Sequence, residues 1–379
     1  MEVSYVLKKK KKWVVLFILF LVCTGTLFFF LHQTQAIDLS EPMQIPQNTR
    51  IQKEFAKIQR ICQGNSQEEC EKCLEEAGFT IIKTDVSGED YLDNPAPLRA
   101  FWDRIQLQQN AGIGLVRIHQ DGTFSYLYFS QVDSQRFCYT ATDRTQEEVS
   151  IELHPVYDWD LTPQGSFFFQ IYPSDVHYAD YGRIKLQPTD PYMYDLVRKY
   201  IAPVGYAQNN LFTCDWAEDN WDELCFTDLL DFLYRLETGE KLDLSILSRS
   251  VNGTYLVPSG LFADTITSFF AIPPEQLQTQ ECYLHSEDVY LYADYSLNYG
   301  TKLDMIPSVI ACHSNEDGTF TLTIAVACKE RKTDELFRHE VTIRPLEDGK
   351  FQYVANHIAY LSEELPFNPS RLDQLENSI

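Results

Sequence analysis

The sequence predicts an α+β fold, in which antiparallel sheets pack with helices after an N-terminal transmembrane helix. Three observations support this prediction. Residues 13–31 carry no charge and directly follow five lysines at 8–12. Beyond them, short helices with capping signals alternate with strand-like runs that end in turn residues. The chain is 44% hydrophobic and 13% aromatic, so its 379 residues can bury a substantial core.

The N-terminal segment predicts a single-pass protein of the plasma membrane. Nineteen uncharged residues at about 1.5 Å per residue are long enough for a hydrocarbon core of about 30 Å. The lysines favour a cytoplasmic location for residues 1–12, which places the bulk of the chain outside the cytoplasm. The membrane is therefore the first expected partner, through residues 13–31.

Two other fates are open for this segment. Thr34, Gln35 and Ala36 offer small residues at a signal-peptide cleavage site, but the apolar run exceeds the usual length of about 7–15 residues. Lipidation of Cys23 would require a small residue before it, where Val22 stands. We expect a retained anchor.

Composition then predicts the domain boundaries. Residues 32–52 are polar with two prolines and form a linker. An N-terminal α+β domain covers 53–248, a C-terminal helix-plus-antiparallel-sheet domain covers 249–361, and 362–379 form a polar tail.

Helix and turn signals locate the elements of the first domain. Ser66 and Glu69 form a capping box before a short helix that Gly78 ends, and Asn94-Pro95 begins another. Asp121-Gly122 forms the turn of a hairpin. The other expected elements are strands near 136–142, 148–157 and 166–172, and helices over 191–201 and 227–237.

The C-terminal domain begins with a helix over 259–271, followed by strands over 307–313, 319–328, 337–345 and 350–358. Cys328 shares the inward face of its strand with Phe320 and Ile324, so we expect it in the core. One helix against a curved sheet is similar to cystatin- or NTF2-like modules, an analogy of fold alone. The string Asp-Gly-Thr-Phe occurs at 121–124 and 317–320, through duplication or through shared hairpin chemistry.

The charge of the chain excludes some partners. Residues 32–379 hold 54 acidic and 26 basic side chains, and the whole chain has a net charge of −24. A phosphate backbone would be repelled, so no nucleic acid is expected as a partner.

Cysteine and catalytic patterns point away from a metal site, a cofactor or an enzyme. Nine cysteines follow the membrane segment, and most are expected to be small buried residues, with one or two disulfides left open as an alternative. Cys70 and Cys73 match the apolar face of their helix, and no second such pair completes a zinc site. The serine-hydrolase, zinc-protease, P-loop and β-lactamase signatures are absent from the sequence. Only a glycosidase-type carboxylate pair stays open.

The best candidate site is the segment 214–225, CDWAEDNWDELC. Trp216 and Trp221 between Asp215 and Asp219 could stack on a sugar or contact a peptide, and the carboxylates could hold calcium. The alternative is a capped turn whose tryptophans enter the core, with a possible disulfide between Cys214 and Cys225. We expect at least one tryptophan in the core.

Three stretches, 194–216, 221–240 and 341–358, resemble an uncharacterised family of extracytoplasmic, membrane-anchored proteins from Gram-positive, Clostridia-type bacteria. The resemblance extends over about residues 60–358 and implies no established activity. The expected function is therefore a membrane-tethered extracytoplasmic binding or interaction protein, non-catalytic, whose partner is an envelope protein or glycan. The alternative is a cell-envelope glycan hydrolase that uses a carboxylate pair.

Overall fold

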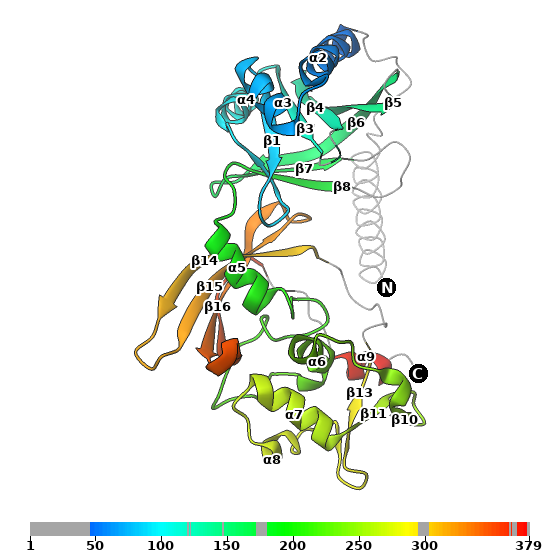
Figure 1. Cartoon of the computed structure of the whole chain (residues 1–379), viewed down its shortest axis with the longest axis vertical. Coiled ribbons are helices and arrows are strands. Elements are labelled where there is room, and N and C mark those ends of the chain that lie inside the picture. The colour runs from blue at the N-terminus through cyan, green and yellow to red at the C-terminus, as the bar shows by residue number, and fades with distance from the viewer. Residues whose placement is uncertain are drawn as a thin grey trace, which may run out of the picture. The chain divides into compact units, whose positions relative to one another are not determined.

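The computed structural model describes residues 46–119, 121, 123–145, 148–171, 180–294, 303–363, 365 and 370–376 (Figure 1). The predicted tail 1–12, the anchor 13–31 and most of the linker lie outside these residues. Among the helices that are described, none is long and apolar enough to span a membrane. The chain divides into two compact units, 1–56 and 57–379. Helix α2 (Pro46–Cys62) begins in the first unit, and all other described elements belong to the second.

Eight strands close into a barrel in the order β1-β2-β8-β7-β6-β5-β4-β3. Most neighbours pair antiparallel, whereas β1 with β3 and β2 with β8 pair parallel. The strands are β1 (Thr80–Thr84), β2 (Asp90–Leu92), β3 (Ala111–Ile118), β4 (Phe124–Val132), β5 (Gln135–Thr145), β6 (Glu148–Leu161), β7 (Ser166–Ile171) and β8 (Asp180–Lys185). The sequence predicted the strands after residue 112 but not their closure into a barrel.

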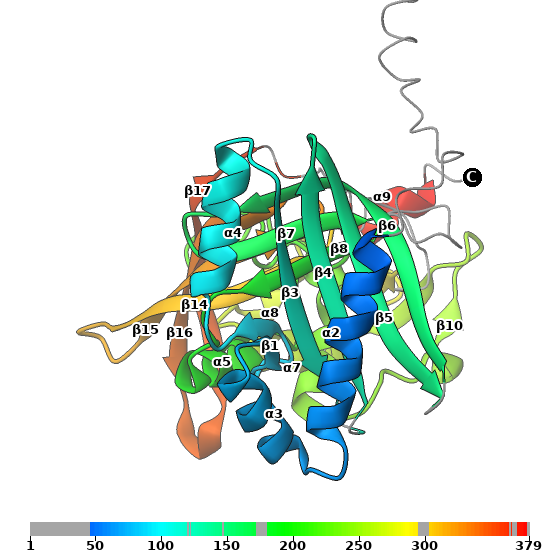
Figure 2. The ribbon, with the colours of Figure 1, turned by 90° about the horizontal axis from the view of Figure 1, so that it is seen from above.

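Aromatic side chains fill the barrel. Phe129 lies 5.3 Å from Phe167 and 4.9 Å from Phe169 between ring centroids. Helix α4 (Ala96–Gln106) lies beside the barrel strands (Figure 2). Its Phe101 ring lies 5.4 Å from that of Trp159, edge to face. Such pairs add about 0.5–1.5 kcal/mol each beyond the burial of their area. Packed side chains thus occupy the interior of the barrel.

The predicted capping box is confirmed at helix α3 (Gln67–Glu76), where Ser66 and Glu69 cap each other's backbone. Cys70 of this helix forms a bond that the sequence did not identify. Cys70 is buried, as its helix face predicted, but it forms a disulfide with Cys62 at the end of α2. The two Cα atoms are 4.9 Å apart, a separation that permits this bond.

Residues 191–361 build two sheets around one further core. The four-stranded sheet has the order β10-β11-β13-β12, and the five-stranded sheet has the order β14-β15-β16-β17-β9. The strands are β9 (Trp216–Ala217), β10 (Ser248–Arg249), β11 (Tyr255–Pro258), β12 (Tyr283–Leu284), β13 (Val289–Tyr292), β14 (Met305–Ser314), β15 (Phe320–Cys328), β16 (Thr333–Pro345) and β17 (Phe351–Leu361).

Helices cover these sheets and end the described chain. They are α5 (Pro191–Leu196), the π-helix η1 (Val197–Ile201), the 3₁₀ turns η2 (Phe226–Asp228), η3 (Leu244–Ile246) and η4 (Glu347–Gly349), and α6 (Leu230–Thr238), α7 (Ser259–Phe269), α8 (Pro274–Leu277) and α9 (Arg371–Glu376). Asp190 caps α5 ahead of Pro191, at the start of the helix that the sequence predicted over 191–201.

The core of this region takes side chains from both sides of the predicted boundary at 248. Phe212, Phe226 and Leu233 lie in the same cluster as Phe262 and Ile324. The C-terminal sheet also receives its edge strand, β9, from upstream of that boundary. The mixed α/β character agrees with the prediction, and the described elements support a barrel of residues 80–185 followed by a second α+β core.

Candidate functional site

The two candidate tryptophans lie in the core. Trp216 is 4% exposed and Trp221 is 3% exposed. Their rings stack at 5.3 Å, and both meet the edge of Phe270 at 5.6 Å. The indole N–H of Trp216 donates to the carbonyl oxygen of Leu211 at 2.7 Å. This arrangement agrees with the core alternative, since stacking on a sugar requires an exposed ring.

The two candidate aspartates are exposed, unlike the tryptophans. The Asp215 carboxylate accepts a hydrogen bond from the backbone N–H of Ile358 at 2.6 Å, beside the pairing of β9 with β17. Asp219 lies in the turn that the Ala217–Asn220 bridge closes. These carboxylates do not converge, and the described part of the chain contains no group of three or more His, Cys, Asp or Glu side chains placed to hold a metal ion.

The proposed disulfide between Cys214 and Cys225 is not formed in the structure, where both thiols are free. Asn210 connects the two positions instead. Its backbone carbonyl accepts from the thiol of Cys214 at 3.1 Å, and its side-chain oxygen accepts from the backbone N–H of Cys225 at 3.1 Å. Its amide also donates to the carbonyl of Glu223 at 2.6 Å. Hydrogen bonds to the backbone and side chain of one residue, Asn210, thus close the loop that a possible disulfide would have closed.

A buried histidine lies behind this loop. Nε2 of His339 is 2.8 Å from the hydroxyl of Tyr206, and Nδ1 is 2.7 Å from the side-chain oxygen of Asn356. The amide of Asn356 in turn donates to the carbonyl of Cys214 at 2.8 Å. Burial lowers the pKa of His339 to about 4, so the ring is neutral at pH 7. Its contacts make it a structural group that supports the loop.

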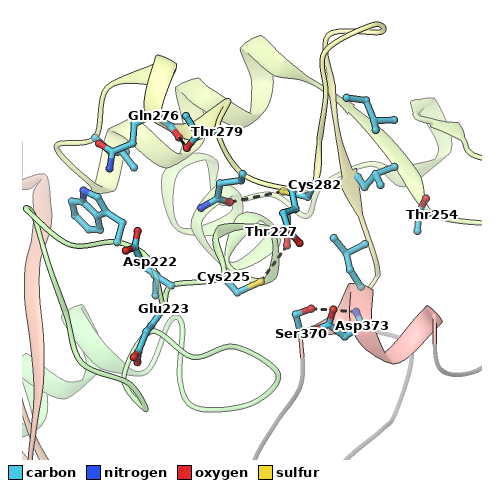
Figure 3. A pocket seen from close by; sticks show the side chains of 18 of the residues that line it. Asp222, Glu223, Cys225, Thr227, Thr254, Gln276, Thr279, Cys282, Ser370 and Asp373 are labelled. Carbon is cyan, nitrogen blue, oxygen red and sulfur yellow. Dashed lines mark hydrogen bonds between the residues drawn. The ribbon is translucent and has the colours of Figure 1, made fainter.

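A cavity of about 820 Å³ opens beside Trp221 (Figure 3). Segments far apart in the sequence line it, from the 221–227 loop to α8 and α9. Asp222 and Glu223 lie on one side in Figure 3, with Ser370 and Asp373 on another. Its remaining polar lining is mostly hydroxyl and amide groups, namely Thr227, Ser250, Asn252, Thr254, Gln276, Thr279 and Gln280.

The charged side chains in the described lining of this cavity are all acidic. Four carboxylates line it, from Asp222, Glu223, Glu281 and Asp373, and its described lining contains no lysine, arginine or histidine. Hydroxyl and amide groups can donate or accept, whereas carboxylates only accept. The cavity therefore suits a ligand that carries hydrogen-bond donors and positive charge.

Two cysteines also line the cavity, but they are not activated nucleophiles. Burial raises the pKa of Cys225 to about 12 and that of Cys282 to about 11. The thiolate is the reactive form, and at pH 7 both groups remain thiols.

Sequence reasoning missed most of this site. The cavity joins residues of the predicted N-terminal domain, C-terminal domain and polar tail. Arg371, in that tail, is 3% exposed. A sequence signal for it was that Arg371 is the only basic residue in the predicted polar tail 362–379 and stands beside Leu372.

The fold and the site define a mixed α/β protein with a closed eight-stranded barrel, a second α+β core and an acidic cavity in that core. The chain belongs to DUF6070, a family of unknown function, whose family model matches residues 39–368. No curated protein matches the chain. No solved structure matches it either. The expectation of an uncharacterised family is thereby confirmed, while the bacterial source and the membrane anchor remain predictions.

Proposed function

We propose that this chain is a membrane-tethered extracytoplasmic binding protein, and that its acidic cavity captures a cationic segment of an envelope protein. The observation that carries the proposal is the cavity of about 820 Å³, with four carboxylates and no basic side chain in its described lining. The size is within the range of about 300–1,000 Å³ that is usual for ligand sites.

Apolar side chains also line the cavity, in addition to the carboxylates. Trp221, Leu224, Ile272, Leu284 and Leu291 contribute to its lining. Long basic side chains combine an apolar stem with a charged end, so they match a site of this mixed character.

The alternative function, a glycan hydrolase, gains no specific support. Such an enzyme needs a carboxylic acid with a raised pKa that is open to the substrate. Burial raises the pKa of Asp228 to about 6 and also raises the pKa of Asp231. Both carboxylates are engaged by Arg371.

The test measures binding of fluorescent hexalysine and hexaglutamate to the full chain in lipid nanodiscs. We expect hexalysine alone to bind, more weakly as salt increases. The double variant Glu223→Gln/Glu281→Gln should weaken binding at least tenfold. The matched control is the double variant Asp219→Asn/Glu316→Gln, because it also removes two carboxylates, both exposed and outside the cavity lining.

Equal losses in the cavity variant and the Asp219→Asn/Glu316→Gln control would overturn the proposal, since net charge would then explain the binding. Capture of soluble glycan strands without hexalysine binding would also overturn it and would favour the glycan alternative.

A further inference from the structure

Helix α9 buries an arginine. Arg371 is 3% exposed, although it belongs to a segment that the sequence presented as a polar tail. Arginine side chains are almost never fully buried unless they are paired. The burial of Arg371 therefore depends on the groups that surround its guanidinium.

Two aspartates anchor this residue. The backbone N–H of Arg371 lies 3.2 Å from each carboxylate oxygen of Asp228, and its Nη2 donates to the carbonyl oxygen of Asp228 at 2.8 Å. Its Nη1 donates to the Asp231 carboxylate at 3.0 Å. Both the main chain and the side chain of the bound segment are thus held.

Three further groups complete the enclosure of the guanidinium. Nε of Arg371 donates to the carbonyl of Gln208 at 3.1 Å, and Nη1 lies 3.4 Å from the hydroxyl of Tyr292. The guanidinium carbon lies 5.3 Å from the ring centroid of Phe232. Acceptors in several directions and an aromatic face match the planar fork of arginine, and a lysine ammonium cannot satisfy all of them at once.

The residues beside Arg371 connect this pocket to the acidic cavity. Ser370, Leu372 and Asp373 form part of the lining of the 820 Å³ cavity. Asp231 and Tyr292, which contact Arg371, line a second cavity of about 490 Å³. The segment therefore lines the first cavity and inserts its arginine side chain beside residues that line the second.

Without Arg371, Asp228 and Asp231 would favour the binding of another cation. Asp228 is 4% exposed, and burial raises its pKa to about 6 even with Arg371 in place. Without a partner, the buried Asp228 carboxylate and the partly buried Asp231 carboxylate are unstable, because desolvation penalises each charge and the charges repel each other.

We propose that Asp228, Asp231, Phe232 and Tyr292 form an arginine-recognition pocket, and that residues 370–376 occupy it in cis and compete with an arginine-containing peptide of a partner. This inference rests on the proposed function in one respect, since the pocket adjoins the same acidic cavity. It adds the chemical group that is recognised and the segment that controls access to it.

The test uses the full chain in nanodiscs and a fluorescent peptide with the sequence of residues 370–376, SRLDQLE. We expect the variant Arg371→Ala to bind this peptide at least tenfold more tightly than the wild type, in which the tail competes. A peptide with lysine in place of arginine should bind at least tenfold more weakly. Adding Asp231→Asn to Arg371→Ala should abolish the preference for arginine. Equal binding of the two peptides by Arg371→Ala would refute the pocket.

A second measurement covers the case in which Arg371→Ala does not fold alone. The arginine peptide should then restore its far-UV circular dichroism and its melting transition, and the lysine peptide should not. Absence of this selective rescue would also refute the proposal.

The two proposals fail separately. If hexalysine binding depends on Glu223 and Glu281 while Arg371→Ala never binds the arginine peptide, only the arginine pocket is refuted. If the arginine peptide binds as expected while hexalysine binding ignores the cavity carboxylates, only the cavity proposal is refuted.

Discussion

Replacing Trp216 with alanine should strongly destabilise the C-terminal core. Truncation of a buried tryptophan costs about 3–5 kcal/mol through lost contacts and the cavity left behind. The indole N–H also bonds the carbonyl of Leu211, a residue that is fully buried. Leaving such an acceptor without a donor costs about 1–3 kcal/mol, so a total loss of about 5 kcal/mol is expected.

Matched variants separate the two contributions. Trp216→Phe retains a ring and loses the N–H, so it should cost about 1–3 kcal/mol plus a smaller packing loss. Trp221→Ala removes the other ring of the stack and should cost about 3–5 kcal/mol. The double variant should show a coupling of about 0.5–1.5 kcal/mol, as expected for an aromatic pair in contact.

Urea unfolding of the full chain in detergent, followed by far-UV circular dichroism, measures these changes without using tryptophan as the probe. With a urea dependence of about 2–3 kcal/mol per molar, Trp216→Ala should lower the midpoint of the affected transition by about 2 M. A loss below about 1 kcal/mol for both alanine variants would refute the core placement and make the loop a recognition surface.

Three other predictions follow from the fold. His339 has a pKa near 4 in the folded chain, so the unfolded chain gains the proton first as the pH falls. The free energy of unfolding should therefore decrease by about 3 kcal/mol between about pH 6.5 and 4. An unchanged pH dependence in His339→Gln would contradict this. Cys328→Ser should cost only about 1 kcal/mol, because Glu330 lies within 3.2 Å of the thiol and can accept from a hydroxyl; rapid labelling of Cys328 in the folded chain would contradict its burial. A protease added to intact cells should degrade residues 32–379 and leave a membrane stub, and an exterior cleaved only after lysis would show that the orientation is reversed.

The sequence was most informative where the signal is local. The capping box at Ser66 and the start of α5 at Asp190 depend on residues three or fewer positions apart. The inward face of β15 follows from alternation within one strand, and Cys328 is fully buried as that alternation predicted.

The features that one sequence did not predict depend on distant partners. Closure of the barrel requires β1 to pair with β3 and β2 with β8, and no local pattern encodes these parallel pairings. Arg371 meets Asp228 across 143 positions of the chain. Asn210 stands in place of the possible disulfide between Cys214 and Cys225, through hydrogen bonds that the spacing of the two cysteines does not predict.

The pairing of β9 with β17 has a consequence for the order of folding during synthesis. All strands of the barrel lie between Thr80 and Lys185, so this part is complete in sequence before the second core begins. That core must wait, because Trp216 pairs with Asn356 and its edge strand has no neighbour until β17 emerges. Closing so long a loop is slow, and apolar surface stays exposed meanwhile. The region around Trp216 and Trp221 is therefore the part of the described chain that we expect to need protection by a chaperone until synthesis ends.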